Sequence, residues 1–169
     1  MIQLTEISCP PVEMDNLLRK HHLLSTALRL HPQLVASLSM ASRVNLLHED
    51  SEILGVMVET PMPDPAILEV MIVPEVRKLH QNRDELSELA SRLRKSWFGN
   101  GFQRVQAVVP LSRIHTKKIF KAMGFVEETR DCGMRNSVNL GKEYEAMCVL
   151  GLLPGDPEKK PYAVQTEVA

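Results

Sequence analysis

The carboxylate of Glu69 is the side chain of this sequence that is best suited to proton chemistry. It interrupts the apolar run Ala66–Val73, and in a strand it would share one face with Ile67 and Val73. Such neighbours remove water from a carboxylate and make it a better proton acceptor, which a general base requires. The pattern equally fits a carboxylate that bonds to a neighbouring strand or faces a wet cleft. Glu59 is the weaker second candidate for the base.

Basic side chains recur in a second segment that is suited to binding. Arg113, Lys117 and Lys121 are spaced four residues apart, so on a helix they form one stripe. Such a stripe binds the phosphate of a cofactor, a nucleic-acid backbone or an acidic protein. A solvated helix face is the simpler interpretation, and it stays open.

Histidines and cysteines give no pattern that predicts a metal site. The six histidines show no H-E-x-x-H or comparable spacing, and Cys9, Cys132 and Cys148 form no C-x-x-C pair. The N-terminal residues contain no basic segment followed by an apolar run, and no apolar stretch reaches membrane-spanning length. We therefore expect a soluble, cytoplasmic protein without a metal or a membrane anchor.

The composition favours one globular domain. The chain has 169 residues, 20 basic and 21 acidic side chains, and a formal net charge of -1, which excludes a globally basic nucleic-acid binder. An aromatic content of 4% argues against a protein that stacks single-stranded bases. Residues 1–153 are expected to form the domain, and the Pro-rich, polar residues 154–169 a tail. Such a tail frays unless something holds it, so we expect a protein partner, a larger assembly or a homo-oligomer.

The elements that must position these residues follow from hydrophobic periodicity and chain breakers. Strands are predicted at Ile2–Ser8, Arg43–His48, Ile53–Glu59, Ala66–Val73, Val105–Val109, Phe125–Thr129 and Tyr144–Leu150. Helices are predicted at Leu17–Leu30, Gln33–Met40, Asp84–Phe98 and Arg113–Met123. The strand Ala66–Val73 is apolar on both faces apart from Glu69, which is typical of a strand in the middle of a sheet. The last two strands are expected to pair through a polar loop that contains Gly133 and Gly141. The order predicts an α+β fold around one mixed sheet.

Two signatures in this order resemble the GNAT superfamily of N-acyltransferases. A central strand ends at Val73 and Pro74, with Arg77 following in the turn, and a later helix ends in an apolar-aromatic and Gly-Phe signature. The second signature consists of Ile119, Phe120, Met123, Gly124 and Phe125. The resemblance covers roughly residues 2–153. It implies a central mixed, mostly antiparallel sheet that is flanked by helices.

The resemblance also implies a chemistry, the transfer of an acetyl group from acetyl-CoA to an amine. Members of the superfamily bind the CoA pyrophosphate on backbone N–H groups at the start of the helix after the central strand, where the helix dipole is positive. A carboxylate on a neighbouring strand, here Glu69, removes the amine proton. The residues expected to bind the cofactor are Val73, Arg77, Lys78, Leu79, His80, Asn82, Arg113 and Lys117.

Three positions depart from the pattern of the superfamily. Its pyrophosphate turn has glycine where this sequence has Lys78, His80 and Asn82, and side chains there would crowd the phosphate. Phe120 replaces the tyrosine that commonly protonates the departing thiolate, and Arg113 replaces an asparagine. Together these departures predict relaxed or altered catalysis.

Two functions follow from this combination. The first is a protein with a degenerate acetyl-CoA motif that serves as a structural or protein-binding module. Small virion or accessory proteins of tailed phages are similar, so such a module could be incorporated in a phage particle. The alternative is an active N-acetyltransferase that uses acetyl-CoA, with Glu69 as its base.

Overall fold

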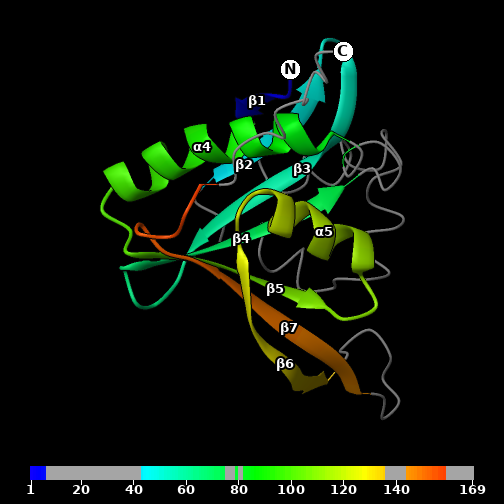
Figure 1. The fold of residues 1–169 in the computed structure, drawn as a ribbon, viewed down its shortest axis with the longest axis vertical. Coiled ribbons are helices and arrows are strands. Elements are labelled where there is room, and N and C mark those ends of the chain that lie inside the picture. Colours follow the sequence, from blue (N-terminus) through cyan, green and yellow to red (C-terminus); the bar gives the residue numbers. More distant parts are fainter. Residues whose placement is uncertain (7–42, 75–78, 80–81, 136–143, 159–169) are drawn as a thin grey trace, which may run out of the picture.

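The computed structural model describes residues 1–6, 43–74, 79, 82–135 and 144–158 (Figure 1). The helices predicted at Leu17–Leu30 and Gln33–Met40 lie outside these residues. So do Arg77, Lys78 and His80, and the greater part of the predicted tail.

Seven strands form one mixed sheet with the order β1-β2-β3-β4-β5-β7-β6. The strands are β1 (Gln3–Glu6), β2 (Arg43–Glu49), β3 (Glu52–Pro61), β4 (Ile67–Pro74), β5 (Arg104–Pro110), β6 (Val126–Arg135) and β7 (Tyr144–Leu152). Among the strands that the structure describes, β4 and β5 pair in parallel, and every other neighbouring pair is antiparallel. The predicted α+β class, the mostly antiparallel sheet and the central place of β4 are confirmed.

Turn chemistry fixes the first hairpin and was misjudged in the last one. Asp50 adopts a positive φ of 51° between β2 and β3, a conformation that Asp tolerates better than most residues. The prediction that Gly133 lies in a loop was wrong, because Gly133 is inside β6 and opposite Ala146. Polar side chains hid this half of β6 in the sequence, while the backbone ladder to β7 continues through it to Arg135.

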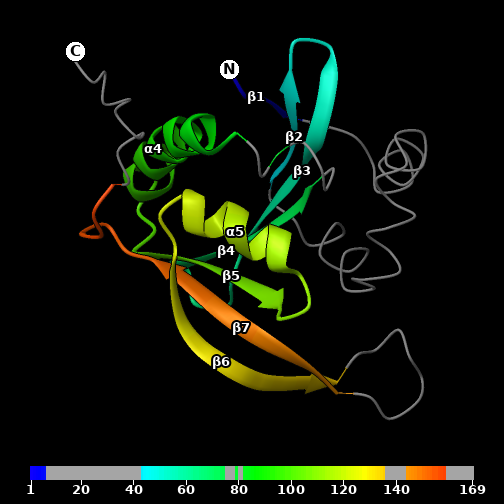
Figure 2. The ribbon, with the colours of Figure 1, turned by 45° about the vertical axis from the view of Figure 1, so that its right-hand side comes forward.

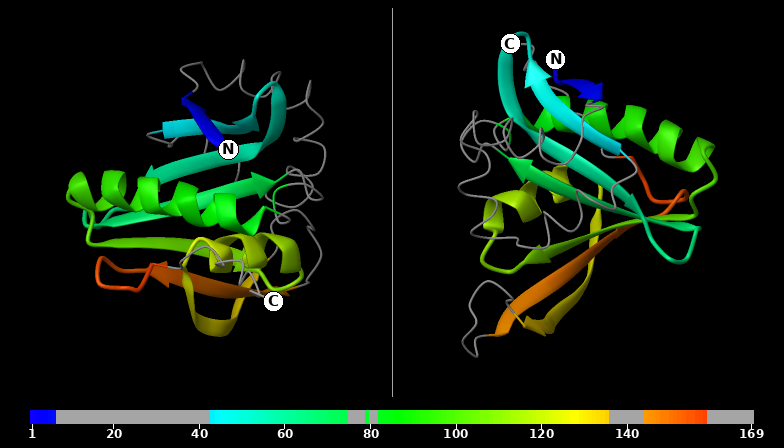
Figure 3. Two further views of the ribbon diagram at one scale, coloured as in Figure 1. Left: turned by 45° about the horizontal axis from the view of Figure 1, so that its top comes forward. Right: turned by 180° about the vertical axis from the view of Figure 1, so that it is seen from behind.

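Two helices, α4 (Arg83–Gly99) and α5 (Ile114–Ala122), lie on the same face of the sheet, as the front view and the view from behind both show (Figures 1 and 3). Helix α4 forms because its apolar residues recur at helical spacing and become buried against the sheet. These residues are Leu86, Leu89, Ala90, Leu93 and Trp97. Gly124, at a φ of 93°, follows α5 and starts the return to the sheet. Neither helix combines the length and the apolarity that a membrane-spanning helix needs, within the described part of the chain.

The main core lies between the two helices and the sheet. Alternate residues of β4 (Leu68, Val70 and Ile72) belong to this core, and each is at most 4% exposed. Phe125 links the helices, since its ring makes edge contacts with the rings of Trp97 and Phe120. Because side chains alternate along a strand, Glu69 points to the opposite face of the sheet.

The residues that follow β7 are fastened to α4. The guanidinium of Arg94, buried to 6% exposure, donates a hydrogen bond to the carbonyl oxygen of Asp156. The Ser91 hydroxyl donates to Glu158 Oε2 at 3.3 Å, and the Leu153 N–H donates to Asp156 Oδ2 at 2.7 Å. The first residues of the predicted tail therefore contact the chain's own helix, and a partner for the remainder stays a prediction.

Candidate functional site

The central strands β4 and β5 are paired along only part of their length and then separate. Their register consists of only three pairs, Ile67–Arg104, Leu68–Val105 and Glu69–Gln106, although the strands have eight and seven residues. Residues 70–74 and 107–110 are not paired with each other, and the two ribbons diverge toward their C-terminal ends in opposite views (Figures 1 and 3). We call this divergence the fork. Helix α5 contacts both strands beside it (Figure 2).

Glu69 lies at the apex of the fork, in the last residue pair before the strands part. Its side chain is partly exposed, and its Oε2 accepts a hydrogen bond from Gln106 Nε2 at 3.4 Å. The Gln106 side-chain oxygen in turn accepts from Arg104 Nε, also at 3.4 Å. A reachable carboxylate with one directed donor is suited to accepting a proton from a ligand at the fork.

A charged pair completes this group of side chains. Arg104 Nη1 donates to Glu128 Oε1 at 2.9 Å, and a second hydrogen bond joins Arg104 Nη2 to Glu128 Oε2. This two-pronged contact lowers the pKa of the Glu128 carboxyl, while slight burial opposes it. Glu128 therefore stays ionised and paired over the neutral pH range.

Solved structures of acetyltransferases share this arrangement of helices and strands. A GNAT-family acetyltransferase from Bacillus anthracis matches with a TM-score of 0.65 at 11% identity, over 90% of this chain and 95% of that chain. The chain has the GNAT fold. An IAA acetyltransferase from Bacillus cereus ATCC 14579 matches with a TM-score of 0.60 at 14% identity, over 90% of this chain and 99% of that chain. A Bacillus subtilis acetyltransferase in complex with CoA matches with a TM-score of 0.59 at 15% identity, also over 90% of this chain and 99% of that chain. No family model and no curated protein matches the sequence.

The start of α4 is where the GNAT resemblance predicts the cofactor phosphates. The helix begins after Asn82, whose side chain makes no capping hydrogen bond. Its first turn carries Asp84 and Glu85, whose carboxylates compete with a phosphate for this positive end of the helix dipole, and Glu85 Oε2 lies 3.4 Å from the N-terminal amino group. Leu79 is fully buried and belongs to the main core, and Val73 is 8% exposed. Their roles in binding stay predictions.

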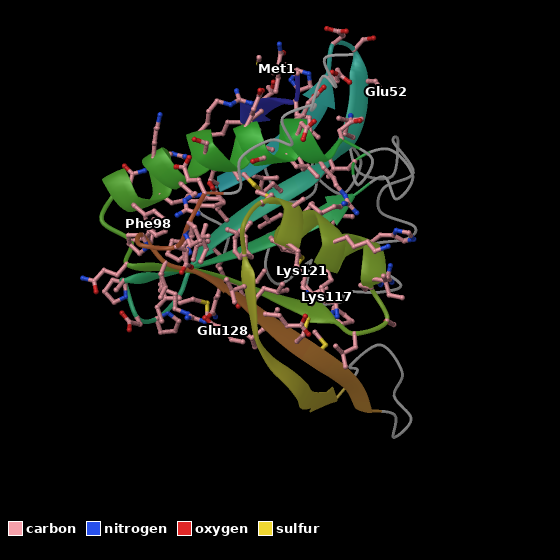
Figure 4. The ribbon with its side chains drawn as sticks, viewed as in Figure 1. Met1, Glu52, Phe98, Lys117, Lys121 and Glu128 are labelled. Carbon is pink, nitrogen blue, oxygen red and sulfur yellow. The ribbon has the colours of Figure 1, made fainter. Side chains whose placement is uncertain are left out.

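The positive charges of the basic stripe on α5 are partly neutralised by the carboxylate of Glu127. Lys121 Nζ lies 2.6 Å from Glu127 Oε2, and Lys117 Nζ lies 3.6 Å from Glu127 Oε1. Figure 4 shows both lysines on α5. Burial raises the pKa of the nearby Cys148 thiol, which is fully buried and therefore unreactive. Arg113 stands immediately before α5, and its predicted role with Lys117 at a cofactor phosphate is untested.

Phe120 occupies the position where the superfamily often has its tyrosine acid. It is 1% exposed, and its ring centroid lies 5.0 Å from that of Phe125 at an interplanar angle of 70°. The side chain is a core residue, so α5 supplies no proton donor at this position. Among the described residues, no three His, Cys, Asp or Glu side chains gather closely enough to hold a metal ion.

Glu59, the second candidate base, lies on the other face of the sheet, beneath α4. It is 4% exposed, one carboxylate oxygen accepts from the indole N–H of Trp97, and the other lies 3.7 Å from Arg43 Nε. Burial raises the pKa of Glu59, and the hydrogen bond from Trp97 and the charge of Arg43 offset part of this effect. The geometry therefore favours Glu69 over Glu59 as the residue that meets a substrate.

We expect Glu59 to make the protein less stable as the pH rises. Its folded pKa lies above the ordinary value for a glutamate, so the folded state holds the proton more tightly than the unfolded state. The associated stability is complete below the unfolded pKa and is lost as the pH rises through the folded pKa. Glu59→Gln should remove this loss, so urea unfolding should show a variant advantage that grows from acidic to neutral pH. The exposed Glu88→Gln is the control, and a pH-independent difference for Glu59→Gln would refute the assignment.

Gln106, Arg104 and Glu128 were not predicted from the sequence as site residues, and neither was Gly151, which lies in β7. Gln106 and Arg104 looked like ordinary polar residues at the edge of an apolar strand, and Glu128 lies 24 residues from Arg104. Only the strand order, which places β7 between β5 and β6, brings these residues together. The alternation of polar residues at 104 and 106 was the one available signal.

Proposed function

We propose that this protein is an N-acyltransferase that moves an acetyl group from acetyl-CoA to an amine, with Glu69 as the general base. One observation carries the proposal: the parallel pairing of β4 and β5 stops at Glu69–Gln106 and leaves a held carboxylate at the apex of the fork. The overall likeness to solved acetyltransferases supports it, as does the sequence resemblance.

The fork offers a binding mode for an extended cofactor. Beyond the apex, the facing edges of residues 70–74 and 107–110 have backbone groups that are not joined by strand pairing to each other. Such an edge can bind an extended chain of amides in the way that a sheet binds an added strand. The arm of CoA contains two amide groups and ends in the thiol that carries the acetyl group. Binding along β4 and β5 would bring the thioester toward Glu69.

Proton balance needs no acid from Phe120. The neutral amine attacks the thioester carbonyl carbon, the bond from carbonyl carbon to sulfur breaks, and the electron pair leaves with sulfur. Glu69, directly or through a water, takes the proton that the nitrogen loses. A thiol has a pKa of about 8.5, so the thiolate is a tolerable leaving group near neutral pH. It then takes up a proton from solvent.

A non-catalytic binding module is the second candidate. The observation that favours it is the first turn of α4, where Asp84 and Glu85 stand at the end that the superfamily uses for phosphates. Repulsion there, together with the turn that lacks glycine, would weaken cofactor binding. A role as a component of a phage particle remains a prediction from the sequence.

Isothermal titration of the purified protein with acetyl-CoA separates the two candidates. The enzyme hypothesis predicts binding in the micromolar range. Dephospho-CoA, which lacks the 3′-phosphate, should bind more weakly than CoA if Arg113 and Lys117 hold that phosphate, and equal affinity would remove them from the site. No heat at sub-millimolar ligand, with folding confirmed by circular dichroism, would overturn the proposed enzyme.

A further inference from the structure

A chain of hydrogen bonds crosses four strands on the face of the sheet opposite α4 and α5. It runs from Glu69 on β4 to Gln106 and Arg104 on β5, and ends at Glu128 on β6. Residues paired across neighbouring strands share a face, and Glu69 pairs with Gln106. Among the side chains that the structure describes on β5 and on residues 126–128 of β6, the other charged ones on this face are Arg104 and Glu128. From β3, Thr60 is paired with Glu69.

The identity of the groups fixes the direction of the chain. An arginine side chain only donates hydrogen bonds, so the atom of Gln106 that faces Arg104 Nε must be the amide oxygen. The amide nitrogen of Gln106 then faces Glu69 and donates to Oε2. Arg104 thus determines which end of the Gln106 amide the carboxylate meets. A flipped amide would present an oxygen to an ionised oxygen, which is repulsive.

The far end of the chain is anchored across β7. Arg104 and Glu128 belong to β5 and β6, and β7 lies between them with Gly151 beneath the ion pair. A Cβ atom at position 151 would lie 2.1 Å from Glu128 Oε1 and 3.1 Å from Arg104 Nη2. The lack of a side chain there therefore leaves the room that the pair occupies. Both partners are partly exposed, so the pair matters more for orientation than for stability.

We propose that Gln106 and Arg104 are positioning residues, which hold the Glu69 carboxylate at the apex of the fork through a directed hydrogen-bond chain anchored on Glu128 over Gly151. The inference rests on the proposed function for its catalytic consequence. The contacts to the amide are long, at 3.4 Å, as catalytic hydrogen bonds often are before a ligand binds.

The test compares four single variants with the wild type. Gln106→Leu removes the chain, and Gln106→Glu keeps an acceptor for Arg104 but takes away the donor to Glu69. Gly151→Ala displaces the anchoring pair without touching Glu69. Gln103→Leu makes the first substitution at an exposed glutamine just before β5 and serves as the control.

Two readouts are needed, and each has a stated expectation. In the first, the protein carries ¹³C-labelled glutamate carboxyl groups, and the Glu69 resonance is identified by its loss in Glu69→Gln. Its chemical shift at neutral pH should change in both Gln106 variants and less in Gly151→Ala, since a hydrogen-bond donor to the carboxylate is lost. In the second, Gln106→Leu should lower kcat about tenfold, while the Kd for acetyl-CoA stays constant.

The outcomes distinguish a failure of the positioning role from a failure of the proposed function. If Gln106→Leu matches Gln103→Leu in both readouts, the positioning role is overturned. If the wild type neither binds nor uses acetyl-CoA, the proposed function fails. In that case the chemical shift of the Glu69 carboxyl group still decides whether Gln106 and Arg104 hold Glu69. An equal loss of folding in all four variants, seen by circular dichroism, would also count against a local role.

Discussion

Glu69→Gln is expected to lower kcat by about 10²- to 10⁴-fold, while the Kd for acetyl-CoA stays close to that of the wild type. Glutamine has almost the shape of glutamate but cannot take the proton that the attacking amine must lose. The residue lies at the apex of the fork rather than along its edges, so ligand contacts with the two strands should survive. Release of free CoA thiol at saturating acetyl-CoA, with a panel of primary amines, measures kcat.

Two matched substitutions make this result specific. Glu88→Gln alters an exposed carboxylate on α4, and Glu59→Gln alters the buried carboxylate on the other face of the sheet. Both should retain turnover within about twofold, because neither side chain reaches a ligand in the fork. A large loss in Glu59→Gln with full activity in Glu69→Gln would exchange the two roles and refute our assignment.

Trp97→Ala is expected to lower the free energy of unfolding by about 3–5 kcal/mol, a range typical of a large aromatic side chain removed from a core. Trp97 is 2% exposed, and its ring makes an edge contact with Phe125 at 6.3 Å. The substitution also leaves the buried carboxylate of Glu59 without its indole donor. Urea unfolding, followed by circular dichroism, gives the value.

Trp97→Phe separates the two causes of that loss. Phenylalanine keeps much of the aromatic packing but has no N–H group, so the cost should be about 1–3 kcal/mol, as expected for an unsatisfied buried acceptor. Combining it with Glu59→Leu should recover part of the loss, because the buried carboxylate that lost its indole donor is then absent, while Arg43 Nε still lies 3.6 Å from Glu6 Oε2. If Trp97→Phe is as stable as the wild type, the hydrogen bond to Glu59 contributes nothing and the account is wrong.

Local signals in the sequence predicted most of the described fold. The apolar faces of α4 and the run through β4 depend on spacing within one segment, and both are found where they were expected. The hairpin between β2 and β3 follows from a short polar turn, with Asp50 in the left-handed region. These features are readable because a single element must bury one face whatever its neighbours are.

The environment of Glu69 was not readable in the same way. The sequence singled out the carboxylate, but its donor Gln106 lies 37 residues away and the anchor at Glu128 lies on another strand. Gly151 carried no turn signal, because a glycine is needed there to leave room for the Arg104–Glu128 pair and not for its backbone conformation. Such relations depend on strand order and register, and neither is encoded by local periodicity.

Because β4 and β5 share so few residue pairs, the sheet consists of two halves whose strands pair mainly within each half. Strands β1–β4 come from residues up to 74 and β5–β7 from residues after 103, and within each half the pairing is antiparallel and extensive. Strand pairing joins the halves through only three residue pairs. A ligand bound between β4 and β5 would contact both halves and link them. Its arrival would sharpen thermal melting and slow amide exchange in both halves at once, so that occupancy would set how far the protein unfolds as one cooperative unit.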